Sequence, residues 1–166
     1  MIQKKICMVG VFATGKTSLV QQYVFSMFSE KYHSTVGVKI DRRRIEVDGS
    51  TVNLVLWDLA GRDGFEDVQT SYLRGAAGVL FVIDGTRRET FEQTFELRAI
   101  CNEAIGEVPA VMALNKCDLT DDWQLNENDY ERLSELGFKH FVTSAKTGDG
   151  VEDAFLWLAT QTLAQA

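Results

Sequence analysis

The chain has 166 residues, with 24 acidic against 17 basic side chains and a formal net charge of −7. At about 100–200 residues per domain, this length predicts one domain over residues 1–166. The 45% hydrophobic and 25% charged residues argue against a disordered or collagen-like chain. The acidic balance argues against nucleic acid or an anionic membrane as a partner, because both require a basic face.

The cysteines and the termini indicate the cellular compartment of the chain. The spacing of Cys7, Cys101 and Cys117 fits neither a zinc site nor a redox pair, which indicates a reduced, cytoplasmic compartment. No signal peptide precedes the first apolar segment, and the longest apolar run, Ala76–Ile83, is shorter than the roughly 20 residues that span a bilayer. No cysteine stands near the last residue, Ala166, so we expect no lipid anchor unless a tail is missing.

Hydrophobic periodicity predicts alternating strands and helices. Short apolar segments predict six strands, over Lys4–Val9, Val36–Val47, Thr51–Trp57, Val79–Ile83, Ala110–Leu114 and His140–Val142. Helical spacing predicts helices over Gly15–Val24, Glu89–Ile105, Asn128–Leu136 and Val151–Ala164. Asp48-Gly49 predicts a hairpin turn. The alternation predicts an α/β fold with a doubly wound, mostly parallel six-stranded sheet and one antiparallel edge strand, whose ligands bind beyond the carboxyl ends of the strands.

A phosphate-binding motif follows the first predicted strand. Gly10-Val11-Phe12-Ala13-Thr14-Gly15-Lys16-Thr17 fits G-x-x-x-x-G-K-[ST] and opens the first predicted helix. In that context backbone N–H groups and the helix N-terminus bind phosphate oxygens. We expect Lys16 to reach the β- and γ-phosphates and the Thr17 hydroxyl to bind magnesium. The alternative is a glycine-flanked turn that matches by chance.

Two polar segments after later strands suggest recognition of a base. The Asp118 carboxylate of Asn115-Lys116-Cys117-Asp118 can accept hydrogen bonds from N1–H and the 2-amino group of guanine, which adenine does not offer in that arrangement. Asn115 can tie the base edge to the loop, and the Lys116 stem can lie along the purine. The backbone of Thr143-Ser144-Ala145-Lys146 could meet the guanine oxygen. A polar turn and a solvated loop are the alternatives.

Two further segments contain candidate magnesium and γ-phosphate contacts. Asp58, in Trp57-Asp58-Leu59-Ala60-Gly61, follows the third predicted strand, where it could hold magnesium through water. The Gly61 N–H could contact a γ-phosphate. Thr35, before the second strand, could complete the magnesium shell, although a lone threonine there is often only a strand residue.

Together these motifs resemble the Ras superfamily of small GTPases, and most closely its Rab branch. The resemblance covers nearly the whole chain, and Ser34–Val38, Trp57 and Tyr72–Ala76 carry the Rab-like features. It implies a P-loop G domain that binds GTP and GDP with Mg²⁺ and acts as a molecular switch. The implied protein is a monomer, and its effectors would bind two switch segments, Ser29–Gly37 and Leu59–Tyr72. An exchange factor and a GTPase-activating protein are further implied partners. The implied nucleotide contacts are Phe12, Ala13, Thr14, Gly15, Lys16, Thr17, Ser18, Phe28, Thr35, Gly61, Asn115, Lys116, Asp118, Ser144, Ala145 and Lys146. The implied metal ligands are Thr17, Thr35 and Asp58. The implied catalytic residues are Lys16, Thr35, Gly61 and Arg62.

The sequence departs from the family pattern where catalysis is concerned. Arg62 stands in place of the glutamine that orients the attacking water, and arginine cannot accept a hydrogen bond from that water. Phe12 replaces a small residue, Ala13 a common glycine, and Leu59 a common threonine. Two functions therefore stay open: a GTPase switch with slow hydrolysis, in which Arg62 could act as an arginine finger in cis, and a hydrolysis-deficient module that acts by stable nucleotide occupancy. A nucleotide kinase is a third reading, which does not account for Asn115–Asp118.

Three other features have two readings each. Phe28 falls where the family places a ring against guanine, or it is a core aromatic. Trp57 and Phe65 are candidate partner contacts, or core residues. The basic run Arg42-Arg43-Arg44 is expected to be a solvated strand face, with an acidic partner as the alternative.

Overall fold

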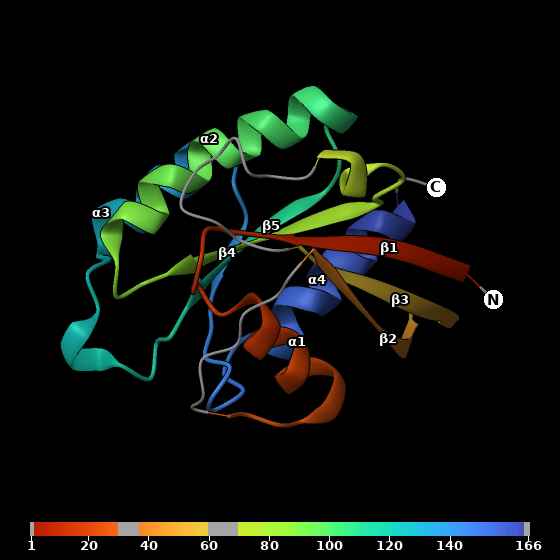
Figure 1. The fold of residues 1–166 in the computed structure, drawn as a ribbon, viewed down its shortest axis with the longest axis horizontal. Helices are drawn as coiled ribbons and strands as arrows, with labels where there is room; N and C mark the ends of the chain where they lie inside the picture. The colour runs from red at the N-terminus through yellow and green to blue at the C-terminus, as the bar shows by residue number, and fades with distance from the viewer. Residues whose placement is uncertain (1, 30–36, 60–69, 165–166) are drawn as a thin grey trace.

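The computed structural model describes residues 2–29, 37–59 and 70–164. Its centre is a six-stranded sheet in the order β2-β3-β1-β4-β5-β6 (Figure 1). The strands are β1 (Ile2–Val9), β2 (Val38–Val47), β3 (Ser50–Leu59), β4 (Gly78–Asp84), β5 (Ala110–Asn115) and β6 (His140–Val142). All neighbouring pairs are parallel except β2 with β3. This confirms the predicted α/β class, its six strands and the antiparallel edge strand.

Helices cover the sheet on both sides, as a doubly wound fold requires (Figure 1). They are α1 (Lys16–Phe25), α2 (Arg88–Ile105), α3 (Glu127–Glu135) and α4 (Val151–Ala164). One core cluster joins α1 and α4 to one face, with Tyr23 stacked on Phe155 at 4.0 Å between ring centroids. A second cluster packs Phe91 and Leu97 of α2 and Leu133 of α3 against the other face. Among the described residues, no helix is both long enough and apolar enough to cross a membrane.

The two faces of the sheet are not equally covered along its width. Every residue of the central strand β4 is buried. In β3, alternate residues Val52, Leu54 and Leu56 are buried, while Val55 and Trp57 on the opposite face are only partly so. Among the described residues, β3 is therefore buried on one face and partly buried on the other, where Trp57 packs against the second core cluster.

Local sequence explains the turn between β2 and β3 and the start of α3. Asp48 and Gly49 between β2 and β3 have φ values of 49° and 82°, and a two-residue hairpin turn of type I′ needs positive φ at both positions. An asparagine begins α3: the Asn126 side chain accepts from the backbone of Asn128 and Asp129 and completes a capping box. Two short 3₁₀ helices, η2 (Thr70–Leu73) and η3 (Thr120–Asp122), were not predicted, because single turns leave no periodic pattern.

Parallel pairing brings the predicted motifs to one edge. Met8 of β1 lies beside Asp58 of β3, and Asp84 of β4 lies beside Asn115 of β5. The carboxyl ends of these strands therefore meet at the same edge of the sheet, where ligands of such folds bind. Residues separated by 101 and 103 positions in the sequence become hydrogen-bonded neighbours there.

Candidate functional site

The loop between β1 and α1 needs glycine at two positions. A Cβ on Gly10 would lie 2.6 Å from the Val82 carbonyl oxygen, so the backbone of β4 leaves no room for a side chain. Gly15 has φ +103°, and a Cβ there would lie 2.4 Å from Asn115 Nδ2. Ala13 has φ 62° without being a glycine. The two glycines of the motif are thus explained by close approach and by backbone conformation.

Three consecutive carbonyls of this loop each accept a hydrogen bond from a side chain near the ends of β4 and β5. The pairs are Arg87 Nη2 with the Phe12 oxygen at 2.7 Å, Lys116 Nζ with the Ala13 oxygen at 3.0 Å, and Asn115 Nδ2 with the Thr14 oxygen at 3.1 Å. In a trans peptide the C=O of one residue and the N–H of the next point in opposite directions, and no described peptide bond is cis. The N–H groups of Ala13, Thr14 and Gly15 therefore point away from these side chains. Successive N–H groups arranged in this way form a concave site for an anion.

The motif lysine lies inside the loop. Lys16 is buried, and its Nζ donates to the carbonyl oxygens of Gly10 at 3.0 Å and Val11 at 3.1 Å. Burial lowers the pKa of Lys16 to about 8; the Asp58 carboxylate raises it in part, and the Arg87 guanidinium lowers it further. A bound anion would favour the charged ammonium and give it a stronger partner than two carbonyls.

The two described metal candidates face each other. Thr17 Oγ1, in the first turn of α1, donates to Asp58 Oδ2 near the end of β3 at 2.6 Å. Asp58 is fully buried, so its carboxylate is held at one place. A hydroxyl and a carboxylate oxygen are donors that Mg²⁺ prefers, and two oxygens this close can enter one octahedral shell. The donor set therefore fits magnesium. The third candidate, Thr35, lies outside the described residues.

The predicted base-recognition residues are tied to one another. Asn115 is buried, and its Oδ1 accepts from Thr143 Oγ1 at 3.2 Å. Asp118 Oδ1 accepts from Ser144 Oγ at 2.7 Å, which fixes the carboxylate next to the β6 loop. Ala145 is buried, whereas Lys146 is exposed. The two polar segments, predicted separately, thus form one hydrogen-bonded unit.

Sequence reasoning missed Asp84, a buried carboxylate at the end of β4. Its Oδ2 accepts from Lys116 Nζ at 2.9 Å and from Arg87 Nε at 3.0 Å, and its Oδ1 accepts from Thr86. Burial alone would raise the pKa of Asp84, but the hydrogen bonds from Thr86, Lys116 and Arg87 outweigh it and hold the pKa below its usual range. A signal was available: Asp84 directly follows the predicted strand Val79–Ile83, as Asp58 directly follows Thr51–Trp57.

Some of the remaining predicted residues lie within the described ranges, and others lie outside them. Ser18 is partly buried in the first turn of α1, and Phe28 is 38% exposed, which does not fit a ring packed in the core. Phe12 is 40% exposed. Gly61 and Arg62 lie outside the described residues, as does most of both predicted switch segments.

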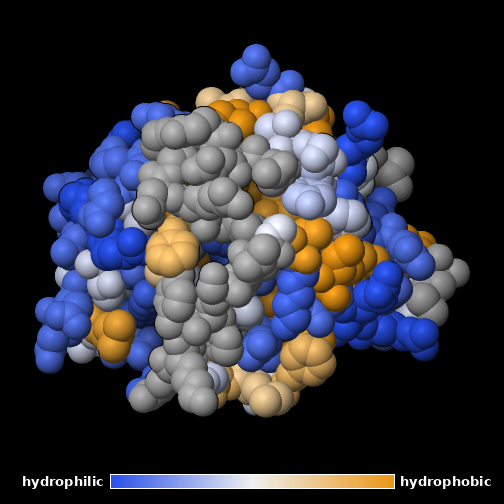
Figure 2. All heavy atoms as spheres, in the orientation of Figure 1, coloured by the Kyte–Doolittle hydropathy of each residue, from blue (hydrophilic) through white to orange (hydrophobic). Residues whose placement is uncertain are grey.

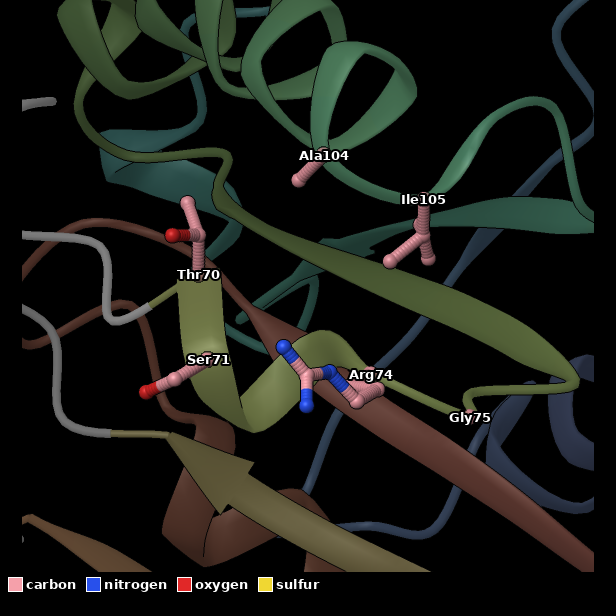
Figure 3. Close-up of a pocket in the computed structure, with 6 residues that line it drawn as sticks. All are labelled: Thr70, Ser71, Arg74, Gly75, Ala104 and Ile105. Carbon is pink, nitrogen blue, oxygen red and sulfur yellow. The ribbon is translucent and has the colours of Figure 1, made fainter.

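A separate hollow lies between η2 and the end of α2 (Figure 3). Its walls are formed by Thr70, Ser71, Arg74, Gly75, Ala104 and Ile105. None of these residues belongs to the motifs at the carboxyl edge of the sheet. The hollow is therefore separate from that edge of the sheet.

Comparison with known proteins agrees with the geometry. The model of the Ras family matches residues 5–164. The chain is 35% identical over 157 residues to the Ras-related protein Rab-8B of Homo sapiens, which covers 93% of this chain and 76% of the relative. It is 34% identical, with the same coverage, to the Ras-related protein Rab-8A of Rattus norvegicus. The chain therefore belongs to the Ras family, and its relatives place it with the Rab-like small GTPases.

Proposed function

We propose that this chain is a switch that binds GTP or GDP with magnesium through residues 10–18, 115–118 and 144–146, and that it hydrolyses GTP slowly. The observation that carries the proposal is the row of three carbonyls, at Phe12, Ala13 and Thr14, held by side chains at and just beyond the ends of β4 and β5 so that the N–H groups of the next three residues face the opposite way. A polyphosphate has the charge and the acceptor oxygens to fill that concave site. Lys16 would then pair with the β- and γ-phosphates.

Guanine is the base that the second segment favours. The Asp118 carboxylate is held by Ser144 and retains acceptor capacity for two N–H donors. Guanine offers two such donors on one edge, and adenine would leave the carboxylate unpaired. Phe28, which is exposed, is available to cover the base.

Magnesium is the proposed cofactor, with Thr17 and Asp58 as two of its contacts. When bound, it neutralises charge on the β- and γ-phosphates. The chain's own part is to keep the Thr17 hydroxyl and the Asp58 carboxylate 2.6 Å apart at the end of β3, so that one ion can reach both.

The experiment that tests the nucleotide proposal is chromatography of the nucleotide released from the purified, denatured protein. GDP or GTP in near-equimolar amount is expected; adenine nucleotide, or none, would overturn the guanine assignment. A variant Asp118→Ala should lose the guanine nucleotide, while Asp149→Ala, an exposed carboxylate beyond the second segment, should retain it.

Slow hydrolysis is the finer part of the proposal, and Arg62 in place of glutamine supports it. Without a residue that orients water, we expect a rate on the order of 10⁻⁴ s⁻¹ or lower, as in Ras without its activator. Single-turnover hydrolysis of bound GTP measures this directly. If Arg62 acts in cis, Arg62→Ala slows the reaction; an unchanged or faster rate removes that role. GTP that persists for many hours would favour the second candidate function, stable occupancy without turnover.

Effectors are proposed to bind the partly open face of β2 and β3. Ile40 of β2, which is 39% exposed, lies beside Trp57 of β3, and Lys5 Nζ lies 3.6 Å from the centroid of the Trp57 ring. Arg42 and Arg44 are exposed on the same side of β2. Apolar surface flanked by hydrophilic residues is visible on the molecule (Figure 2). This combination favours a partner with acidic and apolar side chains.

Charge reversal tests the effector face. Arg42→Glu combined with Arg44→Glu should weaken capture of cellular proteins by the chain loaded with a GTP analogue. Lys39→Glu, on the opposite side of the same strand, is the matched control. Equal capture by all three proteins would contradict an acidic partner.

The three free cysteines support a reducing, cytoplasmic setting for such partners.

A further inference from the structure

Arg87 bridges a buried carboxylate and the phosphate loop. Its Nε donates to Asp84 Oδ2 at 3.0 Å, and its Nη2 donates to the Phe12 carbonyl oxygen at 2.7 Å, across 75 positions of sequence. The following residue, Arg88, turns elsewhere: it pairs with Asp129 at 2.6 Å. Two adjacent arginines at the start of α2 thus have separate partners, and only the first reaches the loop.

The chemistry of arginine suits this bridge. The guanidinium is a planar, permanently charged fork, so one group can hold a carboxylate and a carbonyl at the same time. Asp84 is itself fixed, because it is buried and its other oxygen accepts from Thr86. Arg87 is therefore held at its base by a rigid anchor while its tip holds the Phe12 peptide.

We infer that Arg87 is a positioning residue of the phosphate loop: by holding the Phe12 carbonyl outward, it keeps the Ala13 N–H directed at the β-phosphate region of a bound nucleotide. This inference rests on the proposed nucleotide function and adds a residue to it. The Phe12–Ala13 peptide is the first of the three aligned units and the one farthest from α1, so the helix does not order it. Without Arg87, that peptide would lose its charged hydrogen-bond donor.

Arg87 does not act alone, because Lys116 shares its anchor. Lys116 Nζ bonds the same Asp84 oxygen at 2.9 Å and the next loop carbonyl, that of Ala13, at 3.0 Å. One carboxylate thus holds two cations, and each cation holds one peptide of the loop. The pair links the phosphate loop to the segment proposed to read guanine.

The test is the release of fluorescent GDP from the full chain, with four proteins compared in magnesium buffer. Arg87→Ala should release GDP about tenfold faster than the natural chain, because the loop loses a hydrogen bond from a charged donor. Arg87→Lys should recover part of the loss, because one ammonium replaces the charge without the fork. Arg88→Ala, the adjacent control, should stay within twofold.

A second readout separates positioning from general loosening of the fold. Competition by GMP, which has no β-phosphate, should be equally effective against the natural chain and Arg87→Ala, whereas GDP should lose about tenfold. Unchanged GDP release in Arg87→Ala would overturn the inference and leave the proposed function standing. An equal loss for GMP and GDP would also overturn it. A natural chain that binds no guanine nucleotide would overturn the proposed function and this inference with it.

Discussion

Thr17 Oγ1 lies 2.6 Å from Asp58 Oδ2, although the two residues are separated by 41 positions. The contact joins the first turn of α1 to the end of β3, two elements that β1 holds side by side. It pairs a hydroxyl from the phosphate motif with a fully buried carboxylate. The two oxygens are therefore available to one cation without a large rearrangement of the backbone.

The first prediction concerns removal of the metal. Chelation of Mg²⁺ by EDTA should speed GDP release from the natural chain strongly, because Thr17 and Asp58 are proposed to hold the ion next to the phosphates. Thr17→Ala should release GDP faster in magnesium and respond less to EDTA, since it removes one of the oxygens proposed to hold the ion. Thr17→Ser, which keeps the hydroxyl, should behave like the natural chain. Fluorescent GDP release with and without EDTA measures all three, and an undiminished EDTA response in Thr17→Ala would contradict the assignment.

The second prediction separates the members of the basic run on β2. Arg43 is not solvated as expected: it donates to the Tyr23 carbonyl at 2.9 Å, pairs with Glu152 at 2.6 Å and lies 4.2 Å above the Tyr23 ring. Arg43→Ala should lower the free energy of unfolding by about 1–2 kcal/mol. Arg44→Ala, exposed on the opposite face, should change it by less than about 0.5 kcal/mol. Urea unfolding followed by circular dichroism decides this, and equal effects would show that the Tyr23 contacts add nothing.

The third prediction uses the backbone of the phosphate loop. Ala13 adopts a φ of 62°, a left-handed conformation that costs a residue with a Cβ roughly 1 kcal/mol. Ala13→Gly should therefore raise the free energy of unfolding by up to about 1 kcal/mol, less the entropy that glycine gains in the unfolded chain. Ala76→Gly, at a residue without a positive φ, should lower it. Thermal unfolding of the two variants should therefore shift in opposite directions, and a shared decrease would argue that Ala13 is not strained.

The sequence contained enough to predict the fold and the central motifs, but not the residues that support them. Gly10–Thr17 and Asn115–Asp118 are recognisable because their chemistry depends on local spacing. Asp84 and Arg87 are not, because their role depends on β4 lying between β1 and β5, an order that spacing does not encode. Likewise, the alternation of side chains along β2 predicts that Arg43 lies on the opposite face from Arg42 and Arg44. Which of the two faces is covered depends on where α1 and α4 pack, and that position is not encoded in the strand pattern.

The last prediction concerns cysteine reactivity. Cys7 and Cys101 are buried, and burial raises the pKa of Cys7 to about 11 and that of Cys101 to about 12. Cys117 is partly exposed beside Asp118; burial, with Asp149 and Asp118, also raises its pKa. The thiolate is the reactive form, so alkylation by iodoacetamide should occur first at Cys117 and should accelerate as the pH rises above 8.

Bound nucleotide should slow this alkylation, because Asp118 next to Cys117 is proposed to hold the base. Peptide mass spectrometry at pH 8, with and without GDP, gives the rate at each cysteine. Cys117→Ser should abolish the early reaction, and urea-unfolded protein should react at all three thiols. Alkylation of Cys7 as fast as that of Cys117 would contradict the burial of β1, whereas a Cys117 rate unaffected by GDP would place the base away from Asp118.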